Sequence, residues 1–321
     1  MERQVEAMTS QRRSDSYRSR TALRRAVALA VSLAAVVSLV AGCSLFGPKT
    51  TTVSDDAGRQ VQLKGQPKRI VSMAPSNAEI LFALGLGDRV VGVSNYDNYP
   101  AEAATKEKVG DAFNPNYEKI AALKPDVVLA VGTAQSQIVQ KLEGYKVNVM
   151  VLNAKKVRDV LADITLVGKI TGTSAKAAEV TGAMNKKLND IQAKVATVPA
   201  DKRPAVFWAL DNTLYTVGPG SFVDDLINLA GGRNIAADAK QDYPQYSQEE
   251  LIARDPDVII VPLLDQSMKA QFEAIKGWDK LRAVKANRVY FIDPDLVSRP
   301  GPRIAAGVEE VAKLLHPDLF K

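Results

Sequence analysis

Short apolar runs alternate with amphipathic segments along most of the chain. The runs "RIVSM", "VVGV", "VVLAV" and "VNVMVL" predict strands at 69–73, 90–93, 127–131 and 147–152. Between them, the patterns of 77–85 and 117–123 predict helices. The last two strands are apolar almost throughout, as expected when helices cover both faces of a parallel sheet. This half of the chain is therefore predicted to form a parallel α/β lobe.

A different pattern begins at Ser174 and contains neither a proline nor a strand signal. Apolar residues recur there at spacings of three and four: Ala177, Val180, Met184, Leu188, Ile191 and Val195. This spacing predicts one amphipathic helix to about residue 198, with Ser174 as its N-cap. At 1.5 Å per residue, some 22 residues span about 33 Å, which is the width of a domain. Beyond it, "PADKRPAVFWAL" restarts the alternation, which predicts a second lobe.

The two halves share a sequence pattern in the same order. When Pro125 is aligned with Pro256, "YEKIAALKPDVVLA" matches "QEELIARDPDVIIV". Asn116 then aligns with Ser247, and both are predicted N-caps. Upstream, "AEILFALGLG" matches "DDLINLAGGR". Pro-Asp turns before strands are common in unrelated proteins. Two matches in one order nevertheless favour a pseudo-repeat, and the predicted fold is two Rossmann-like α/β lobes with parallel sheets, joined by one long α-helix.

The N-terminus has the layout of a secretory signal. A basic stretch precedes seventeen uncharged, mostly apolar residues that end at Cys43, the single cysteine of the chain. A transmembrane anchor is the alternative, although spanning a bilayer takes about 20 apolar residues. "LVAGC" resembles a lipobox, which favours cleavage before Cys43 and its lipidation. The true start, Met1 or Met8, stays open.

These patterns predict five segments. They are a lipoprotein signal peptide at 1–42, a lipid-anchored flexible tether at 43–58, a first lobe at 59–172, an interlobe helix at 173–198 and a second lobe at 199–321. The polar sequence after Cys43, with its Gly, Pro and Thr run, is the basis for the tether.

Charge and residue content exclude several functions. Residues 1–42 carry +4 of the net charge of +6, so the remaining chain is nearly neutral and lacks the basic surface of a nucleic-acid-binding protein. A bare metal ion usually needs several histidines with carboxylates, and this chain has only His316. Cysteine–histidine and serine–histidine catalysis lack their thiol or base. We therefore expect no metal site, no catalytic residues and no enzyme activity.

Several separated motifs resemble one family. "KRIVSMAPSNAEILFALGLGDRVVGVSNYDNYP", "NYEKIAALKPDVVLA", the single long helix, "QEELIARDPDVIIV" and "SRPGPRI" are similar to substrate-binding lipoproteins of ABC importers, over roughly residues 57 to 318. The branch with a single interlobe helix binds cobalamin, haem and ferric siderophores. Within this branch, the sequence most resembles the cobalamin binders. The resemblance implies a monomer without a resident cofactor. It would face the periplasm or the cell exterior, hold its cargo in an interlobe cleft and deliver it to a permease.

The resemblance also implies one acidic residue on each lobe that docks to arginines of the permease dimer. The matching residues are Glu79 in "SNAEILFALG" and Glu249 in "YSQEEL". Both have a competing structural explanation, because Ser76 with Glu79, and Ser247 with the neighbouring Glu250, have the spacing of a capping box. Glu249 itself does not occupy the capping-box position.

Aromatic residues gather in or beside loops that follow predicted strands, where open α/β sheets bind ligands. They are Tyr96, Tyr99, Phe113, Trp208, Tyr215, Tyr243 and Tyr246. Such rings suit a large, flat, partly apolar cargo such as a corrin or porphyrin. Some of them could instead seal lobe cores. Trp208, inside an apolar run, is the first candidate for that role.

"DPDLVSRPGPRI" adds polar groups for the cargo. Asp295, Ser298 and Arg299 could bind amides, phosphate or carboxylates, whereas Arg303 is expected to pair within the structure. The chain departs from cobalamin binders by carrying Ala112, Phe113 and Tyr243 where those often have tryptophan. Haem, through a tyrosinate of Tyr96 or Tyr99, or a ferric siderophore therefore stays an alternative cargo. An α/β enzyme or sensor on the same fold is a further alternative.

Overall fold

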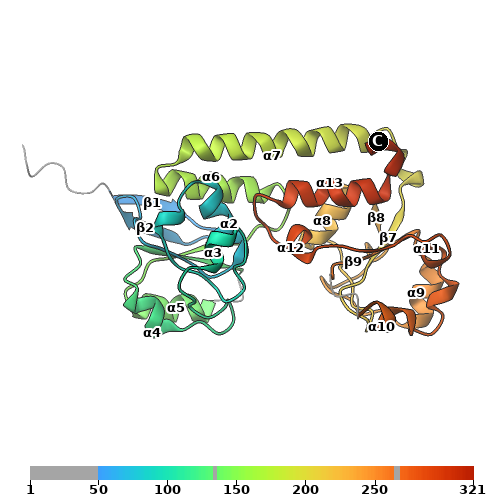
Figure 1. Ribbon diagram of the computed structural model, residues 1–321, viewed down its shortest axis with the longest axis horizontal. Coiled ribbons are helices and arrows are strands. Elements are labelled where there is room, and N and C mark those ends of the chain that lie inside the picture. Colours follow the sequence, from blue (N-terminus) through green and yellow to red (C-terminus); the bar gives the residue numbers. More distant parts are fainter. Residues whose placement is uncertain (1–49, 133–135, 264–267) are drawn as a thin grey trace, which may run out of the picture. The chain divides into compact units, whose positions relative to one another are not determined.

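The computed structural model describes residues 50–132, 136–263 and 268–321 (Figure 1). The signal segment and Cys43 lie outside these residues. Within the described ranges, no helix has the length and hydropathy needed to cross a membrane.

The first lobe is built on a four-stranded parallel sheet in the order β4-β3-β5-β6. Its strands are β3 (Ile70–Ser72), β4 (Val90–Gly92), β5 (Val127–Val131) and β6 (Val149–Leu152). The surrounding helices are α2 (Pro75–Ala83), η1 (Gly87–Arg89), α3 (Ala101–Ala104), α4 (Tyr117–Ala122), α5 (Ser136–Gly144) and α6 (Asp159–Thr171). Alternate strand residues pack into two separate apolar clusters, so both faces of the sheet are covered.

A two-stranded sheet precedes this lobe. It consists of β1 (Thr50–Ser54) and β2 (Gln60–Lys64), and Val53, Val61 and Leu63 from it enter the apolar core. The predicted tether of 43–58 is therefore too long, since the chain is folded from Thr50 onward. The Thr run that suggested flexibility consists of β-branched residues, which suit a strand once its apolar neighbours have a core to join.

The second lobe repeats the first. Its parallel sheet has the order β10-β9-β7-β8, and its strands are β7 (Ala205–Trp208), β8 (Arg233–Asn234), β9 (Val258–Val261) and β10 (Val289–Phe291). The helices are η3 (Ala200–Lys202), α8 (Phe222–Leu229), α9 (Gln248–Arg254), α10 (Lys269–Glu273), η5 (Trp278–Lys280), α11 (Arg282–Lys285), α12 (Pro294–Val297), α13 (Ile304–Leu315) and η6 (Pro317–Phe320). These orders place β3, β4, β5 and β6 in the same sheet positions as β7, β8, β9 and β10, which supports the pseudo-repeat.

The repeat extends to the helix ends. The N-cap prediction is confirmed for Asn116 and Ser247, whose side chains accept the backbone N–H of Lys119 and Glu250 at 2.9 and 3.0 Å. Upstream, α2 and α8 are each followed closely by a glycine with positive φ, Gly85 and Gly231. Glycine adopts this conformation without the steric cost that other residues incur.

The predicted long helix is confirmed as α7 (Ser174–Val195). It ends at Val195, earlier than predicted, and Ser174 is its first residue and not its N-cap. Thr173 precedes it without a side-chain capping bond. Five of the six apolar residues that predicted the helix are buried, and the sixth, Val180, packs against the same cluster.

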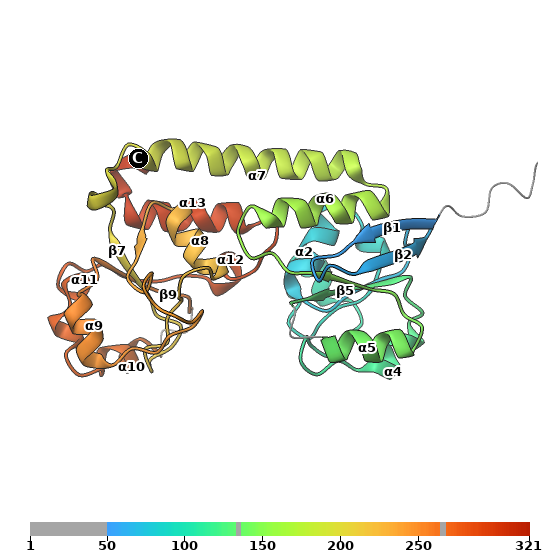
Figure 2. The ribbon, with the colours of Figure 1, turned by 180° about the vertical axis from the view of Figure 1, so that it is seen from behind.

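One apolar cluster runs through both lobes. In Figures 1 and 2, α7 lies beside α6 of the first lobe and α13 of the second, and both helix pairs are in contact. The cluster includes Ile164 on α6, Leu188 on α7 and Val308 on α13, together with one face of each sheet. Pulling the lobes away from this spine would expose apolar surface to water, so the spine opposes large hinge motions.

Candidate functional site

The loops at the carboxyl ends of the parallel strands carry most of the predicted cargo residues. The loop after β4 holds Tyr96 and Tyr99, and the loops after β7 and β8 hold Tyr215 and Tyr243. Phe113 follows a segment that pairs in parallel with Val93 at the end of β4. Asp295, Ser298 and Arg299 follow β10. Open α/β sheets bind ligands at this edge.

Five of the predicted aromatic residues expose their rings to solvent. The exposed fractions are 66% for Tyr96, 47% for Tyr99, 81% for Phe113, 41% for Tyr215 and 58% for Tyr243. In the described part of the chain, three other large hydrophobic residues are comparably exposed: Tyr145, Leu210 and Ile252. Exposing an aromatic ring to water is unfavourable, and a group of such rings marks a binding surface.

Trp208 does not belong to this surface. It ends β7 and is fully buried in the apolar cluster shared by the lobes, while its neighbour Phe207 packs into the cluster on the opposite face. A strand covered on both faces buries consecutive side chains, so the predicted core role of Trp208 is confirmed and its listing as a cargo residue is wrong. Tyr246 is also buried and stacks on Phe207 at 6.2 Å between ring centroids.

The loop after β4 is held in place by a buried carboxylate. Asp97 accepts hydrogen bonds from the Ser94 hydroxyl at 2.6 Å and the Ser94 N–H at 3.3 Å. The ammonium of Lys108 donates to the carbonyls of Ser94 and Asp97 at 3.2 and 2.9 Å. Burial raises the pKa of Asp97 to about 6, against the opposing effect of the Ser94 hydrogen bonds. These bonds fix the backbone that carries Tyr96 and Tyr99.

An ion-pair network joins this loop and α2 to the second lobe. Arg303 donates to both carboxylate oxygens of Glu79, at 2.9 and 2.6 Å, and Arg299 donates to one of them at 3.2 Å. Arg299 also donates to Asn98 at 2.7 Å and pairs with Asp295 at 2.7 Å. Asn98 donates in turn to Asp295 at 2.9 Å. We call these five residues the interlobe network.

Glu79 is therefore an internal residue, with only 3% of its surface exposed. A permease-docking role does not fit this position, because the carboxylate is buried between two arginines of the same chain. The alternative capping box with Ser76 is also wrong. Helix α2 begins at Pro75, with Ala74 at the N-cap and no side-chain capping bond. Arg303, which was expected to pair within the structure, does so.

The remaining polar candidates differ in how freely they face solvent. Ser298 is exposed, and Asp295 is partly exposed through its position on α12. Arg299 has 12% of its side chain exposed and is occupied by the interlobe network. Ser298 is thus the polar cargo candidate that is most accessible, while Arg299 lies mostly beneath the surface.

The second predicted docking residue, Glu249, is exposed in the first turn of α9. The fold places Glu118 in the corresponding position of α4, where it is also exposed. Within the described residues, neither carboxylate forms an ion pair. Glu250 differs, since it pairs with Arg254 at 3.6 Å.

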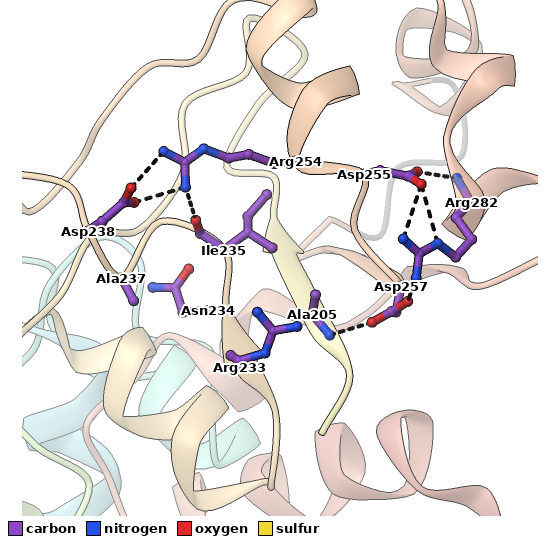
Figure 3. Close-up of a pocket in the computed structure, with 10 residues that line it drawn as sticks. All are labelled: Ala205, Arg233, Asn234, Ile235, Ala237, Asp238, Arg254, Asp255, Asp257 and Arg282. Atoms are coloured by element: carbon purple, nitrogen blue, oxygen red, sulfur yellow. Dashed lines mark hydrogen bonds and ion pairs between the residues drawn. The ribbon is translucent and has the colours of Figure 1, made fainter. Parts of the chain in front are cut away.

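A pocket of about 400 Å³ lies at the opposite, amino ends of β7, β8 and β9 (Figure 3). Its polar wall consists mainly of paired charges. Arg254 bonds both carboxylate oxygens of Asp238, and Arg282 bonds Asp255 and Asp257. This pocket lacks the exposed rings of the carboxyl edge. Among the described residues, no group of three or more His, Cys, Asp or Glu side chains is placed to hold a metal ion.

The architecture and the exposed loops define a class of two-lobed binding proteins, and comparison with known proteins agrees. Residues 70–296 match the family described as periplasmic binding protein. An uncharacterized ABC transporter substrate-binding lipoprotein, YvrC of Bacillus subtilis, is 39% identical over 84% of this chain and 87% of its own. A cobalamin-binding protein of Halobacterium salinarum is 30% identical over 83% and 74%.

Two solved structures are also similar. The vitamin B12 binding protein BtuF of Vibrio cholerae has a TM-score of 0.70 and 28% identity, over 78% of this chain and 97% of its own. The heme-binding protein BhuT, solved with two hemes, has a TM-score of 0.70 and 26% identity, over 79% and 100%. The chain thus belongs to the periplasmic binding protein family.

Proposed function

We propose that this protein is the substrate-binding lipoprotein of an ABC importer, and that it captures cobalamin or a related corrinoid between its lobes for delivery to a permease. The observation that carries the proposal is the set of five exposed rings at the carboxyl edges of both sheets. Relatives named for cobalamin or vitamin B12 support the corrinoid as cargo. The proposed role is capture and delivery without catalysis.

Corrinoid chemistry suits this surface. The corrin ring is broad and partly apolar, so it would bury Tyr96 and Phe113 on the first lobe and Tyr215 and Tyr243 on the second. Amide groups at the rim of the corrin require hydrogen-bond partners. The tyrosine hydroxyls and Ser298 supply such groups without a cost for desolvating a full charge.

Haem is the second candidate cargo, and a specific residue favours it. Tyr96 is 66% exposed on the loop after β4, and a tyrosinate oxygen can bind the iron of a ferric haem. The similarity to the heme-binding BhuT supports the same alternative. A ferric siderophore is a third candidate, with Ser298 and the tyrosine hydroxyls as hydrogen-bond partners.

Titration of residues 44–321 with cyanocobalamin, haemin and ferric siderophores tests the cargo. We expect cyanocobalamin to bind with a Kd of about 1 μM or lower and to be recovered unchanged. Phe113→Ala should weaken binding, whereas Tyr145→Ala, an exposed ring in the loop before β6, should not. Binding of haemin alone, with a tyrosinate absorption band, would replace the corrinoid by haem. Chemical conversion of the cargo would favour an enzyme.

For permease docking we propose Glu249 on the second lobe and Glu118, in place of Glu79, on the first. Both are exposed and unpaired within the described residues, and both sit in the first turn of repeat-related helices. A carboxylate in the first turn of a helix also interacts favourably with the helix dipole, and both side chains are accessible to arginines of a partner.

We further propose that Cys43 carries a lipid that anchors the protein to the membrane, facing the periplasm or cell exterior, and that the protein acts as a monomer. Its relative YvrC is named a lipoprotein, which supports the anchor. Replacing Cys43 by Ser should release the protein from the membrane fraction of expressing cells. Retention of that variant in the membrane would point to the uncleaved anchor.

A further inference from the structure

Glu79 is the central group of the interlobe network. Its side chain is 2% exposed and receives hydrogen bonds from two guanidinium groups, both from the other lobe. Arg303 binds it through two nitrogens, the geometry in which arginine–carboxylate bonds are strongest and most directional. The hydrogen bond and charge of Glu79 raise the pKa of Arg303 further, so the guanidinium stays charged.

Each arginine holds a residue of the candidate cargo surface. The guanidinium of Arg303 lies over the ring of Tyr99, 3.9 Å from its centroid, and covers one face of a ring that is 47% exposed. Arg299 holds the side chains of Asn98 and Asp295. The side chains that join the loop after β4 to the start of α12 are therefore bound by Arg299 and Arg303. Both arginines are in turn bound by Glu79.

The backbone between the arginines is adapted to this contact. Gly301 is buried, and a Cβ atom added there would lie 3.3 Å from Oε2 of Glu79 and 3.5 Å from the carbonyl oxygen of Ser76. The 3.3 Å distance is tighter than most Cβ contacts, so a glycine allows the segment between Arg299 and Arg303 to approach the Glu79 carboxylate closely. The motif "SRPGPRI" thus contains three residues that form the interlobe contact: Arg299, Gly301 and Arg303.

We propose that Glu79 is a positioning residue, which orients Tyr99 of the first lobe and the Asn98–Asp295 pair across the lobes for the incoming cargo. It does so from beneath the surface, through Arg303 and Arg299. The part of this inference that concerns cargo affinity rests on the proposed function. The part that concerns the ordering of the two loops does not.

Hydrogen–deuterium exchange on the full-length chain in detergent micelles, without cargo, tests the ordering. We expect Glu79→Gln to increase exchange in peptides covering 94–104 and 294–304, because a neutral amide cannot hold both arginines. Arg303→Lys keeps the charge but loses the second bond and the flat contact with Tyr99, so it should act in the same direction. Unchanged exchange in both peptides of a folded variant would overturn the proposal.

Glu309→Gln is the matched control. Glu309 forms a 2.7 Å ion pair with Lys187 that joins α13 to α7, away from both loops. This variant should leave the exchange of both peptides unchanged. If it loosens them as much as Glu79→Gln does, Glu79 contributes only general stability and the proposal fails.

Cyanocobalamin titration of the same proteins tests the consequence for binding. Glu79→Gln and Arg303→Lys should each weaken binding roughly tenfold, and the double variant should add little, because both act through one network. Loosened loops with unchanged affinity would refute the positioning role. If the wild-type chain does not bind cyanocobalamin, the proposed cargo is wrong, and the exchange data still decide the ordering role.

Discussion

At the residue scale, burial decides what each carboxylate does. Asp163 on α6 is 3% exposed and lies beside the carboxyl of Asp56. Burial, followed by the charge and hydrogen bond of Asp56 and the charge of Asp159, raises the pKa of Asp163 to about 8. At neutral pH this side chain is therefore protonated in the folded protein and ionised in the unfolded chain.

This protonation predicts a loss of stability as the pH rises. Between its ordinary pKa of 3.8 and about 8, the folded state holds a proton that unfolding releases. The free energy of unfolding should then fall by up to about 1.4 kcal/mol per pH unit and level off above pH 8. Asp97 contributes in the same direction, but only up to its pKa of about 6.

Urea unfolding between about pH 7 and 8 measures mainly the contribution of Asp163, because most of the proton uptake by Asp97 and by the unfolded-state His316 occurs at lower pH. Asp163→Asn stays neutral at every pH, so this variant should lose the decline in that range. Asp88→Asn, at an exposed carboxylate in η1, serves as the control and should keep it. An equally steep decline in Asp163→Asn would contradict the assignment.

At the element scale, α7 belongs to both lobes. Leu188 is 1% exposed, in the apolar cluster that also contains residues of α6 and α13. Truncating it should lower the free energy of unfolding by about 2 to 5 kcal/mol, through lost apolar contact and the cavity left behind. Because both lobes share the cluster, we expect both to be destabilised.

Unfolding of Leu188→Ala, followed by hydrogen exchange in β5 and β9, measures this effect in each lobe. Lys186→Ala, at an exposed position of the same helix, is the control and should change stability little. Destabilisation confined to one lobe would show that α7 is a linker and not a common spine.

The spacing of apolar residues along the sequence predicted some elements correctly and missed others. The three-and-four spacing of apolar residues placed α7 correctly because this pattern is local and continuous over 22 residues. The apolar run around Trp208 correctly indicated a core position, and only the listing of this residue among the cargo candidates was wrong. The same reasoning failed for Thr50–Ser54 because a strand this short depends on a core supplied by other segments.

At the scale of the whole molecule, the repeat places Glu118 and Glu249 on corresponding helices, and this predicts their joint effect. A Glu118→Ala, Glu249→Ala protein should bind cargo like the wild type and fail to support uptake of labelled cyanocobalamin by cells. The physical reason is that two ion pairs to the permease would be lost while the cargo surface stays intact.

The control for docking is Glu102→Ala with Glu273→Ala, which removes one exposed carboxylate from each lobe on other helices. That protein should retain uptake. Normal uptake by the Glu118→Ala, Glu249→Ala protein would rule out these residues as the docking pair.

The sequence by itself determined the α/β class, the long helix and the repeat, because each follows from patterns within a few turns or strands. It also placed the aromatic loops after strands, where five of seven rings proved to be exposed. Only the tertiary structure decided the role of Glu79. Its partners Arg299 and Arg303 lie 220 and 224 residues away, and folding the second lobe against α2 brings them to a carboxylate that the sequence alone suggested was available for docking.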